Sequence, residues 1–370
     1  MRTVIVTDVR YRTAPAVIRP LARKGYSVVA VQTRAESPRA PAAFSSRYVS
    51  RRVLLDGSVK DAGYAERLYA LCASFAERPV LFPIGADTLA VLSAQRERFS
   101  AVCDFLVAPP DVLELANDKA RLAQCAQRLS VPTPQTYGVQ DKRLPVILKP
   151  RCGEKLGLHA EERYCKAYTQ AQFDAALEKL RAYDPQPVIQ ELVEGDGMGV
   201  CLVMDRAHRP VSVICHRRVR EYPVGGGPSA CCVSIYDETA VRRAVSLLQA
   251  IEFTGIAMVE FKGAYLLECN PRIWGSFPLT DACGSRFAEN YVRAACGQTL
   301  PLDDGYRRGV RMRFFLNDTL ATLSCLRHGK LRAALGGVAD VFRAKEALFR
   351  FTDQKPFWRY LWLTLRGNKS

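Results

Sequence analysis

Short apolar runs alternate with amphipathic stretches along the first hundred residues. The apolar runs are rich in Val, Ile and Leu, which is typical of buried strands, and the stretches between them place apolar residues at helical spacing. Strands that alternate with helices form parallel sheets flanked by helices, so residues 1–108 are expected to be an α/β domain. The predicted strands are residues 3–7, 27–32, 52–55 and 80–83, and the predicted helices are residues 16–24, 64–76 and 88–99.

The pattern changes towards β structure near residue 146. A helical region at residues 111–129, bounded by prolines, comes before the change, and only two further helices interrupt the apolar runs that follow. Residues 109–304 are therefore expected to form an α+β domain. The predicted strands are residues 146–149, 188–192, 199–204, 211–216, 230–235, 256–261 and 265–268, and the two helices are residues 171–183 and 238–251.

The turn after the first predicted strand carries charged residues instead of glycines. Residues 8–13 read DVRYRT where a dinucleotide-binding protein would have GxGxxG. This exclusion means that any nucleotide is bound elsewhere in the chain, or in a different manner.

Charge is distributed unevenly. The chain has 370 residues, with 53 Lys and Arg against 37 Asp and Glu, so its formal charge of +16 favours an anionic substrate or partner. Residues 305–370 form a basic extension that is expected to be helical and ends in the sequence FWRYLWLTL at 357–365. Its apolar residues have helical spacing, which fits two alternatives: peripheral contact with an anionic membrane, or packing on the protein's own surface.

The thirteen cysteines indicate reduced thiols, not a disulfide framework. Several lie inside apolar runs, and the sequence contains no CxxC pair, so neither disulfides nor a zinc site is expected. The first residues turn polar too soon for a secretory signal, and no apolar stretch approaches 18 residues. A cytoplasmic protein is expected, with membrane contact limited to the peripheral kind.

Two carboxylates and an amide have the spacing of a metal site. Glu260 ends one apolar run, and Glu268 and Asn270 lie two positions apart in the next. On adjacent antiparallel strands these side chains would point to one face, where three hard oxygens suit Mg²⁺ bound to a polyphosphate. The alternative is a pair of half-exposed strands with solvated acids.

Two other segments carry features of a nucleotide site. Lys149 ends an apolar strand before a loop that contains Gly153, whose backbone N–H groups suit phosphate oxygens. Lys119, on the preceding helix, supplies a second cation. Residues 188–197, VIQELVEGDG, combine a strand with an acidic turn, which fits a hinge that pairs with a planar base. A solvated lysine and an ordinary short loop are the alternatives.

In this order, the segments resemble the ATP-grasp superfamily, specifically its carboxylate–amine ligase branch. The resemblance covers about residues 1–300 and implies a Rossmann-like domain, then a small nucleotide-binding subdomain at about 130–195 and a larger metal and substrate subdomain at about 196–304. The motifs that carry it are NDK at 117–119, ILKP at 147–150, QELVEG at 190–195, VEF at 259–261 and LECNPR at 267–272.

The resemblance also implies a reaction and roles for residues. ATP phosphorylates a carboxylate, and an amine then attacks the acyl phosphate to give an amide, ADP and phosphate. Phosphates would contact Lys119, Lys149 and Gly153; adenine would contact Gln190, Glu191 and Val193; ribose would contact Glu194 or Asp196; one or two Mg²⁺ ions, with Mn²⁺ as the alternative, would bind Glu260, Glu268 and Asn270; and Lys149 and Arg272 would act on the transferring phosphoryl group or the acyl phosphate.

A basic strand with a glycine turn is the candidate substrate site. His216, Arg218 and Arg220 would share one face of a strand, which suits bidentate capture of a carboxylate or phosphate, and Gly226 lies in the turn that would close over it. An exposed basic strand followed by a hairpin is the alternative. The expected substrates are a carboxylate and an amine, either small molecules or polymer precursors.

One departure from the family pattern and two other functions stay open. The phosphate loop carries Glu154 and Lys155 where many relatives have small or hydroxyl residues, which leaves its contacts with phosphate uncertain. An ATP-binding kinase-like or regulatory protein of the same fold is the first alternative function. A nucleic-acid-binding protein is the second, although the chain lacks a recognition motif, so no specific nucleic acid is expected.

Overall fold

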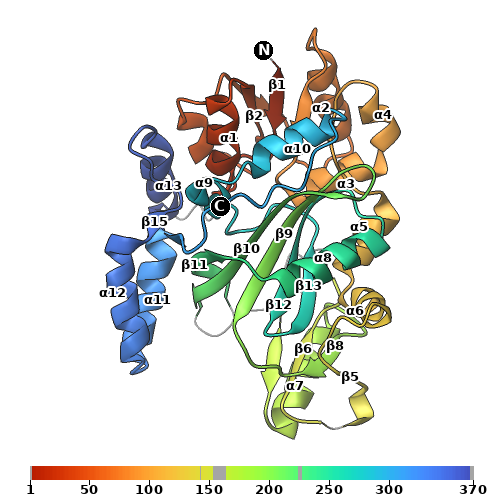
Figure 1. Ribbon diagram of the computed structural model, residues 1–370, viewed down its shortest axis with the longest axis vertical. Coiled ribbons are helices and arrows are strands. Elements are labelled where there is room, and N and C mark those ends of the chain that lie inside the picture. The colour runs from red at the N-terminus through yellow and green to blue at the C-terminus, as the bar shows by residue number, and fades with distance from the viewer. Residues whose placement is uncertain (1, 142, 153–163, 224–226, 367–370) are drawn as a thin grey trace.

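The first four strands form a parallel sheet, as the alternating pattern predicted. The computed structural model describes residues 2–141, 143–152, 164–223 and 227–366, and Figure 1 shows the sheet near the N-terminus. Its order is β3-β2-β1-β4, and every pair is parallel. The strands are β1 (Thr3–Val6), β2 (Ser27–Thr33), β3 (Arg51–Leu55) and β4 (Val80–Phe82), and the helices are α1 (Ala14–Arg23), α2 (Tyr64–Ala73), α3 (Ala86–Ala94) and α4 (Arg96–Ser100), with a short 3₁₀ helix η1 (Ala42–Ser45).

The helix predicted at residues 88–99 is two helices. The backbone leaves helical geometry at Gln95, with φ −118° and ψ 33°, and α4 starts in a new direction after it. Nothing in the apolar spacing of this stretch marks the break, because Leu92 and Phe99 on either side of it are both fully buried.

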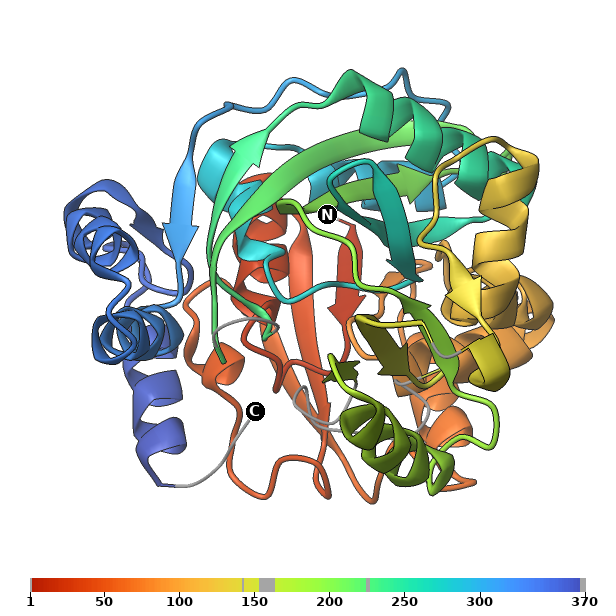
Figure 2. The same cartoon turned by 90° about the horizontal axis from the view of Figure 1, so that it is seen from below.

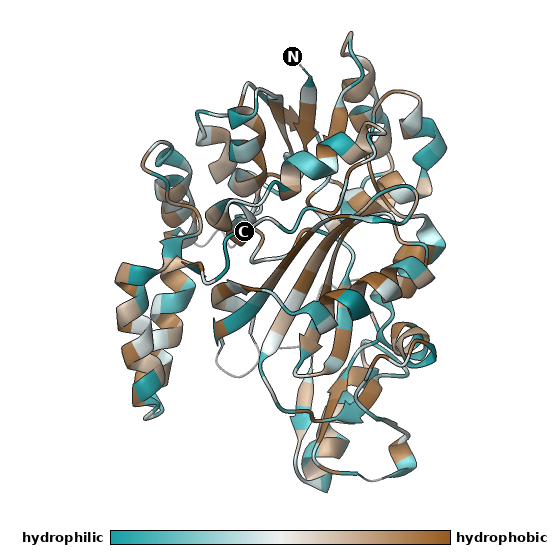
Figure 3. Cartoon of the chain, viewed as in Figure 1, coloured by the Kyte–Doolittle hydropathy of each residue, from teal (hydrophilic) through white to brown (hydrophobic). Residues whose placement is uncertain are grey.

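A seven-stranded sheet forms the centre of the molecule. Hydrophobic residues are concentrated on its middle strands (Figure 3). Tyr291 of the helix at residues 287–295, which accompanies this sheet, donates its buried hydroxyl to the carbonyl of Leu81 in the N-terminal sheet. The order is β13-β12-β9-β10-β11-β14-β15, with β9 (Gly197–Met204), β10 (Pro210–Glu221), β11 (Ser229–Ile235), β12 (Gly255–Lys262), β13 (Tyr265–Asn270), β14 (Arg311–Arg313) and β15 (Lys345–Glu346); the accompanying helices are α8 (Glu238–Ala250), α9 (Pro278–Cys283) and α10 (Phe287–Ala295).

A small antiparallel sheet lies below the β12–β13 edge in Figure 1. Its order is β5-β8-β6-β7, and one face packs on α7 (Gln170–Arg181) around Val146 and Leu148. The strands are β5 (Thr136–Tyr137), β6 (Val146–Lys149), β7 (Cys165–Ala167) and β8 (Val188–Glu191), reached through η2 (Val139–Asp141) and the helices α5 (Pro110–Asn117) and α6 (Lys119–Arg128). Because α7 covers one face only, the other face is left for a site.

The basic extension is folded against the body and is not wholly helical. It contributes β14 and β15 to the central sheet. The helices α11 (Phe315–Arg327) and α12 (Leu331–Arg343) lie between these strands in the chain, and α13 (Lys355–Leu365) follows β15. Figure 2 shows the three helices together on one side of the molecule. Gly337 lets α11 and α12 approach closely, because a Cβ there would lie 2.1 Å from the Thr322 hydroxyl.

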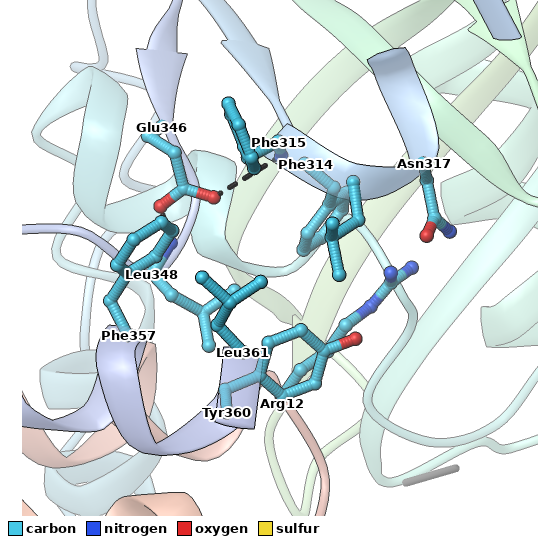
Figure 4. A pocket seen from close by; sticks show the side chains of 10 residues that line it. Arg12, Phe314, Phe315, Asn317, Glu346, Leu348, Phe357, Tyr360 and Leu361 are labelled. Atoms are coloured by element: carbon cyan, nitrogen blue, oxygen red, sulfur yellow. Dashed lines mark hydrogen bonds between the residues drawn. The ribbon is translucent and has the colours of Figure 1, made fainter. Parts of the chain in front are cut away.

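Two arginines fasten the extension to the N-terminal region. Arg19 of α1 is buried and donates to Asp353 Oδ2 at 2.8 Å and to the carbonyl of Leu348 at 2.7 Å. Arg12 reaches a cavity of about 10 Å³ between α11 and α13, where its guanidinium lies 3.7 Å from the ring centroid of Phe314 (Figure 4). Among the described residues, no helix is both long and apolar enough to cross a membrane.

Candidate functional site

The three candidate metal ligands lie together on one face of the central sheet. In the register of β12 and β13, Glu260 pairs with Glu268 and Met258 pairs with Asn270, and paired residues of antiparallel strands point to the same side. The amide Nδ2 of Asn270 donates to Glu260 Oε1 at 3.2 Å and to Glu268 Oε1 at 3.3 Å. Period-two spacing therefore brings the two carboxylates and the amide of Asn270 into one cluster.

Two lysines from different elements face this cluster. Lys119 is the first residue of α6, which Asp118 caps by accepting from backbone N–H groups, and its ammonium lies 3.0 Å from Glu268 Oε2. Lys149 ends β6 on the face that α7 leaves uncovered, and it is 8% exposed. Lys149 makes no ion pair with any described residue. A buried ammonium without a partner is costly, and an anionic ligand would supply one.

The carboxylate cluster, the two lysines and the side chains around them are together called the cleft. Their charges shift one another's pKa values. Burial lowers the pKa of Lys149 to about 8, against the opposing pull of Glu268. Burial would raise the pKa of Glu268, but Lys119 and Lys149 outweigh it and bring it to about 2. Burial would lower the pKa of Lys119, but Glu268 outweighs it, so that value is raised. Glu268 is therefore ionised at neutral pH and available as a ligand for a cation.

Arg218 and Arg272 extend the charged face on either side. Arg218 donates to Glu260 and, at 3.1 Å, to Glu221, and the proximity of Glu260 raises its pKa. Burial is the largest influence on Glu260 and raises its pKa, against the charge of Arg218. Arg272 Nη2 lies 3.5 Å from Asn270 Oδ1. Both arginines thus border the carboxylate cluster.

The residues expected to hold the base lie at the end of β8 and in the turn after it. Gln190 is 2% exposed and lies on the same face of the small sheet as Lys149, because it pairs with Ile147, two positions before Lys149. Its Oε1 has no hydrogen-bond partner among the described residues. A buried amide oxygen without a donor is rare, and an exocyclic amine of a purine would supply one. Val193 is buried nearby in the sequence.

The acidic residues of the same segment have other surroundings. Glu191 is half-buried, and its Oε2 accepts from the backbone N–H of Gln135 at 3.4 Å. Glu194 is exposed, and Asp196 accepts from Arg217 at 2.8 Å. Between them Gly195 has φ +123°, and a Cβ there would lie 3.0 Å from the backbone nitrogen of Gly263. Only glycine allows this turn to approach the β12–β13 hairpin so closely.

Two of the predicted substrate residues are occupied elsewhere, which corrects the sequence-based expectation. Arg220 is buried and donates to Asp318 Oδ1 at 2.7 Å and to Asp340 Oδ2 at 2.8 Å, so it joins the extension to β10. His216 is buried with its Nε2 3.0 Å from Ser276 Oγ, and burial lowers its pKa to about 3. A neutral histidine does not attract an anion. Gly153 and Gly226, together with Glu154 and Lys155, lie outside the described residues.

A cavity that the sequence did not indicate lies beside Arg272. It has a volume of about 310 Å³ and is lined by residues of α3 and α5 together with Pro271, Arg272 and Cys152. The only sequence signal was the position of Pro271 and Arg272 directly after the carboxylate strand. Trp274, two residues after Arg272, does not line this cavity and packs in an aromatic cluster, with its ring centroid 5.0 Å from that of Phe277.

Comparison with known proteins agrees with this geometry. Residues 116–276 match the family model of the ATP-grasp domain. This part of the chain is an ATP-grasp domain. The matched region begins just before α6, which starts at Lys119, and ends at Ser276, just past β13. It therefore contains every residue of the cleft described above. A search of curated protein sequences returned no match.

Solved structures share the fold of this chain at low sequence identity. Biotin carboxylase from Campylobacter jejuni has a TM-score of 0.63 and 16% identity, over 83% of this chain and 74% of that one. The biotin carboxylase domain of Hydrogenobacter thermophilus 2-oxoglutarate carboxylase has a TM-score of 0.61 and 18% identity, over 84% and 73%. L-amino acid ligase from Bacillus licheniformis has a TM-score of 0.57 and 14% identity, over 81% and 75%.

Proposed function

We propose that this protein is an ATP-dependent carboxylate–amine ligase that forms an amide through an acyl phosphate and releases ADP and phosphate. The observation that carries the proposal is Lys149. It is buried, it has no ion-pair partner among the described residues, and it faces a cluster of hard oxygen ligands. An anion would pair with the ammonium of Lys149, and a divalent cation bound with that anion would pair with the oxygen ligands.

ATP supplies groups that match the unsatisfied ones. Its phosphates would pair with Lys149 and with Lys119, whose present partner is Glu268. Its adenine would reach Gln190, where the exocyclic amine is a donor for the free Oε1. The turn with Glu194 and Asp196 lies after the base-binding strand and would take the ribose hydroxyls. These contacts together hold the nucleotide between the small sheet and the central sheet.

Three residues of β12 and β13 fit Mg²⁺. Glu260, Glu268 and Asn270 bring two carboxylates and an amide within hydrogen-bonding distance of one another, and all three offer the hard oxygens that Mg²⁺ prefers. Mn²⁺ has similar preferences and is the alternative. When bound, the metal ion neutralises phosphate charge. Lys119 and Arg218 now provide the positive charge that keeps the two carboxylates together in the free protein.

Arg272 lies between the carboxylate cluster and the cavity, which suits the second half of the reaction. An oxygen of the substrate carboxylate attacks the γ-phosphorus, the bond to the ADP oxygen breaks, and an acyl phosphate results. The amine nitrogen then attacks the acyl carbon and phosphate leaves with its bonding electrons, while the amine loses its proton. Arg272 would hold the acyl phosphate, and the cavity of about 310 Å³ would hold a substrate away from water.

The likenesses to solved structures support this class of reaction. One is named an L-amino acid ligase, and the Hydrogenobacter thermophilus domain is described in complex with MgADP and bicarbonate. The test is ADP release measured over a matrix of carboxylates and amines, with bicarbonate among the carboxylates. We expect release that requires one carboxylate and one amine together. Release that needs only one acceptor would indicate a kinase-like activity, and MgATP binding without any release would indicate a regulatory protein; either would overturn the proposal.

A further inference from the structure

The helices of the C-terminal extension leave long apolar rows uncovered. On α11, Leu320, Leu323 and Leu326 are 44–55% exposed, although they repeat at helical spacing. On α12 the same is true of a row that ends in Phe342, which is 88% exposed. The exposed apolar residues of α12 are Leu331 at 61%, Leu335 at 69%, Val338 at 56%, Val341 at 53% and Phe342 at 88%. A row of this kind on a surface normally marks a binding face.

Helix α13 divides its apolar residues between two faces. Pro356 and Leu363 are buried where the helix packs on η1, which gives the packing that the sequence offered as one alternative. Trp358 is nevertheless 55% exposed, Trp362 is 37% exposed and Leu365 is 76% exposed. The guanidinium of Arg366 lies 4.5 Å from the ring centroid of Trp362. Trp358, Trp362 and Leu365 are therefore still exposed for the other alternative that the sequence offered, which is peripheral contact with an anionic membrane.

A chain of aromatic contacts joins α13 to the start of α11. The rings of Phe357 and Phe315 are 6.3 Å apart, and Phe357 lies 5.5 Å from Phe349, which in turn lies 5.1 Å from Phe351. Phe351 is 86% exposed. Figure 2 shows α11, α12 and α13 grouped on the same side of the molecule. The apolar residues of the three helices thus belong to one region of the surface, which we call the extension surface.

The acidic side chains of the extension are buried or half-buried, whereas many of its basic side chains are exposed. The extension contains only four acidic residues, and none of them is exposed: Asp318, Asp340 and Asp353 are buried, and Glu346 is half-buried with backbone N–H groups donating to it. Seven cations between α11 and the end of α13 are exposed: Arg327, Lys330, Arg332, Arg343, Lys345, Lys355 and Arg366. The extension surface therefore presents apolar and cationic side chains without an exposed carboxylate.

Buried ion pairs hold this surface in place. Arg220 joins Asp318 of α11 to Asp340 of α12, and Arg19 joins Asp353 to α1. The exposed rows are consequently presented by helices fixed to the body at their inner faces. A surface organised before binding loses less conformational entropy when a partner arrives.

We propose that the extension surface binds the interface of an anionic lipid bilayer. Leucine, tryptophan and phenylalanine side chains on helices that lie flat enter the headgroup region, while cations around them pair with lipid phosphates. A second copy of this chain is a poorer occupant, because it would bring two cationic surfaces together. The proposal does not depend on the reaction catalysed in the cleft.

Tryptophan fluorescence gives a direct test with the full-length protein. Of the three tryptophans, Trp274 is 2% exposed, whereas Trp358 and Trp362 lie on the extension surface. On addition of phosphatidylcholine–phosphatidylglycerol vesicles (1:1) at low salt, we expect a blue shift of the emission and quenching by brominated lipid chains. Pure phosphatidylcholine vesicles should bind at least tenfold more weakly. Raising the salt should release the protein.

Matched variants separate the extension surface from general surface chemistry. The double variant Trp358→Ala, Trp362→Ala, followed by co-sedimentation, should bind at least tenfold more weakly, and Tyr168→Ala, Tyr183→Ala, which removes two aromatics exposed elsewhere, should bind like wild type. The triple variant Lys330→Ala, Arg332→Ala, Arg343→Ala should lose roughly fivefold per cation. Its control is Lys60→Ala, Arg128→Ala, Lys179→Ala, which removes the same charge from exposed positions outside the extension.

Three results would overturn the proposal. One is equal, negligible sedimentation with both vesicle types at low salt. Another is a loss of binding in the two control variants as large as in the extension variants, which would show that net charge alone drives the association. The last is a stable dimer in sedimentation equilibrium that the Trp358→Ala, Trp362→Ala variant abolishes, because this would assign the extension surface to a second copy.

Discussion

The cleft and the join between the extension and the body both bury charged side chains, but the two regions differ in how well those side chains are paired. Arg19 donates to a carboxylate and to two backbone carbonyls, and its partner Asp353 also accepts from Ser46. In the cleft, Lys149 has no ion pair with a described residue, and Gln190 keeps a buried oxygen without a donor. Arg19 and Asp353 therefore find their partners within the protein, whereas Lys149 and Gln190 Oε1 lack partners among the described residues.

The difference separates structural charge from functional charge. A buried polar group without a partner costs about 1–3 kcal/mol, and more for a charged group, so a protein has no structural reason to keep one. A ligand that restores the missing partners recovers that free energy on binding. Satisfied pairs such as Arg19 with Asp353 are therefore expected to affect stability, and Lys149 is expected to affect ligand binding.

The largest effect is expected from the carboxylate cluster. Glu268→Gln and Asn270→Ala should each reduce ATP turnover by about 10³-fold or more, because loss of a ligand for the metal ion removes several kcal/mol of transition-state stabilisation. ADP production with Mg²⁺ as the only metal measures this, and far-ultraviolet circular dichroism checks the fold. Glu178→Gln, an exposed carboxylate of α7, is the control. Near-wild-type turnover in either cleft variant would refute the assignment.

The next largest effect concerns the satisfied pairs. Arg19→Met leaves buried Asp353 without its cation, which should lower the free energy of unfolding by about 3–5 kcal/mol. Arg220→Met should lower it less, because Arg313 still pairs with Asp318 and Arg311 still pairs with Asp340. Urea denaturation measures the loss. Turnover per folded molecule, assayed well below the unfolding transition, should stay close to wild type. A variant with full stability but a raised KM for a substrate would return Arg220 to the substrate site.

Smaller effects should separate the two halves of the active site. Lys149→Ala is expected to raise KM for ATP by about tenfold to a hundredfold, the size of one lost charge-assisted contact with phosphate. Arg218→Ala, further along the charged face, is expected to raise KM for the second substrate and to leave KM for ATP nearly unchanged. Steady-state kinetics with each substrate varied in turn distinguish them. The reverse pattern would exchange the two sites.

The smallest predicted effect is a pH dependence of stability from His216. Its pKa is about 3 in the folded protein, whereas an unfolded chain would give about 6.5. Between these values the unfolded state binds a proton that the folded state does not, so stability is complete above about pH 6.5 and falls below it, by at most about 1.4 kcal/mol per pH unit. His216→Gln should flatten the slope measured by urea denaturation from pH 7 to pH 5. Parallel slopes would contradict this.

Local patterns predicted most of the elements and the shared face of the candidate metal ligands. The period-two spacing of Glu268 and Asn270 was enough to place both on one face, and apolar runs located β6 and β12 within a residue or two. The alternation of strands and helices predicted the parallel sheet because each element signals itself within about ten residues.

Long-range partners could not be predicted in this way. Arg220 was assigned to a substrate because it shares a strand face with Arg218, but its partner Asp318 lies 98 residues further along the chain, in a helix with no matching signal. The cavity beside Arg272 is lined by helices that the strand motifs do not mention. The division of α13 between a packed and an exposed side likewise depends on where η1 lies.

Thermal unfolding of wild type, Lys149→Met and Arg19→Met, each with and without MgATP, tests the central distinction most directly. Removing the buried ammonium of Lys149, which pairs with no described residue, should raise the unfolding temperature of the ligand-free protein and abolish most of the stabilisation by MgATP. Arg19→Met should unfold at a lower temperature and gain as much from MgATP as wild type. A Lys149→Met protein that is destabilised without ligand and still gains the full MgATP shift would contradict the account.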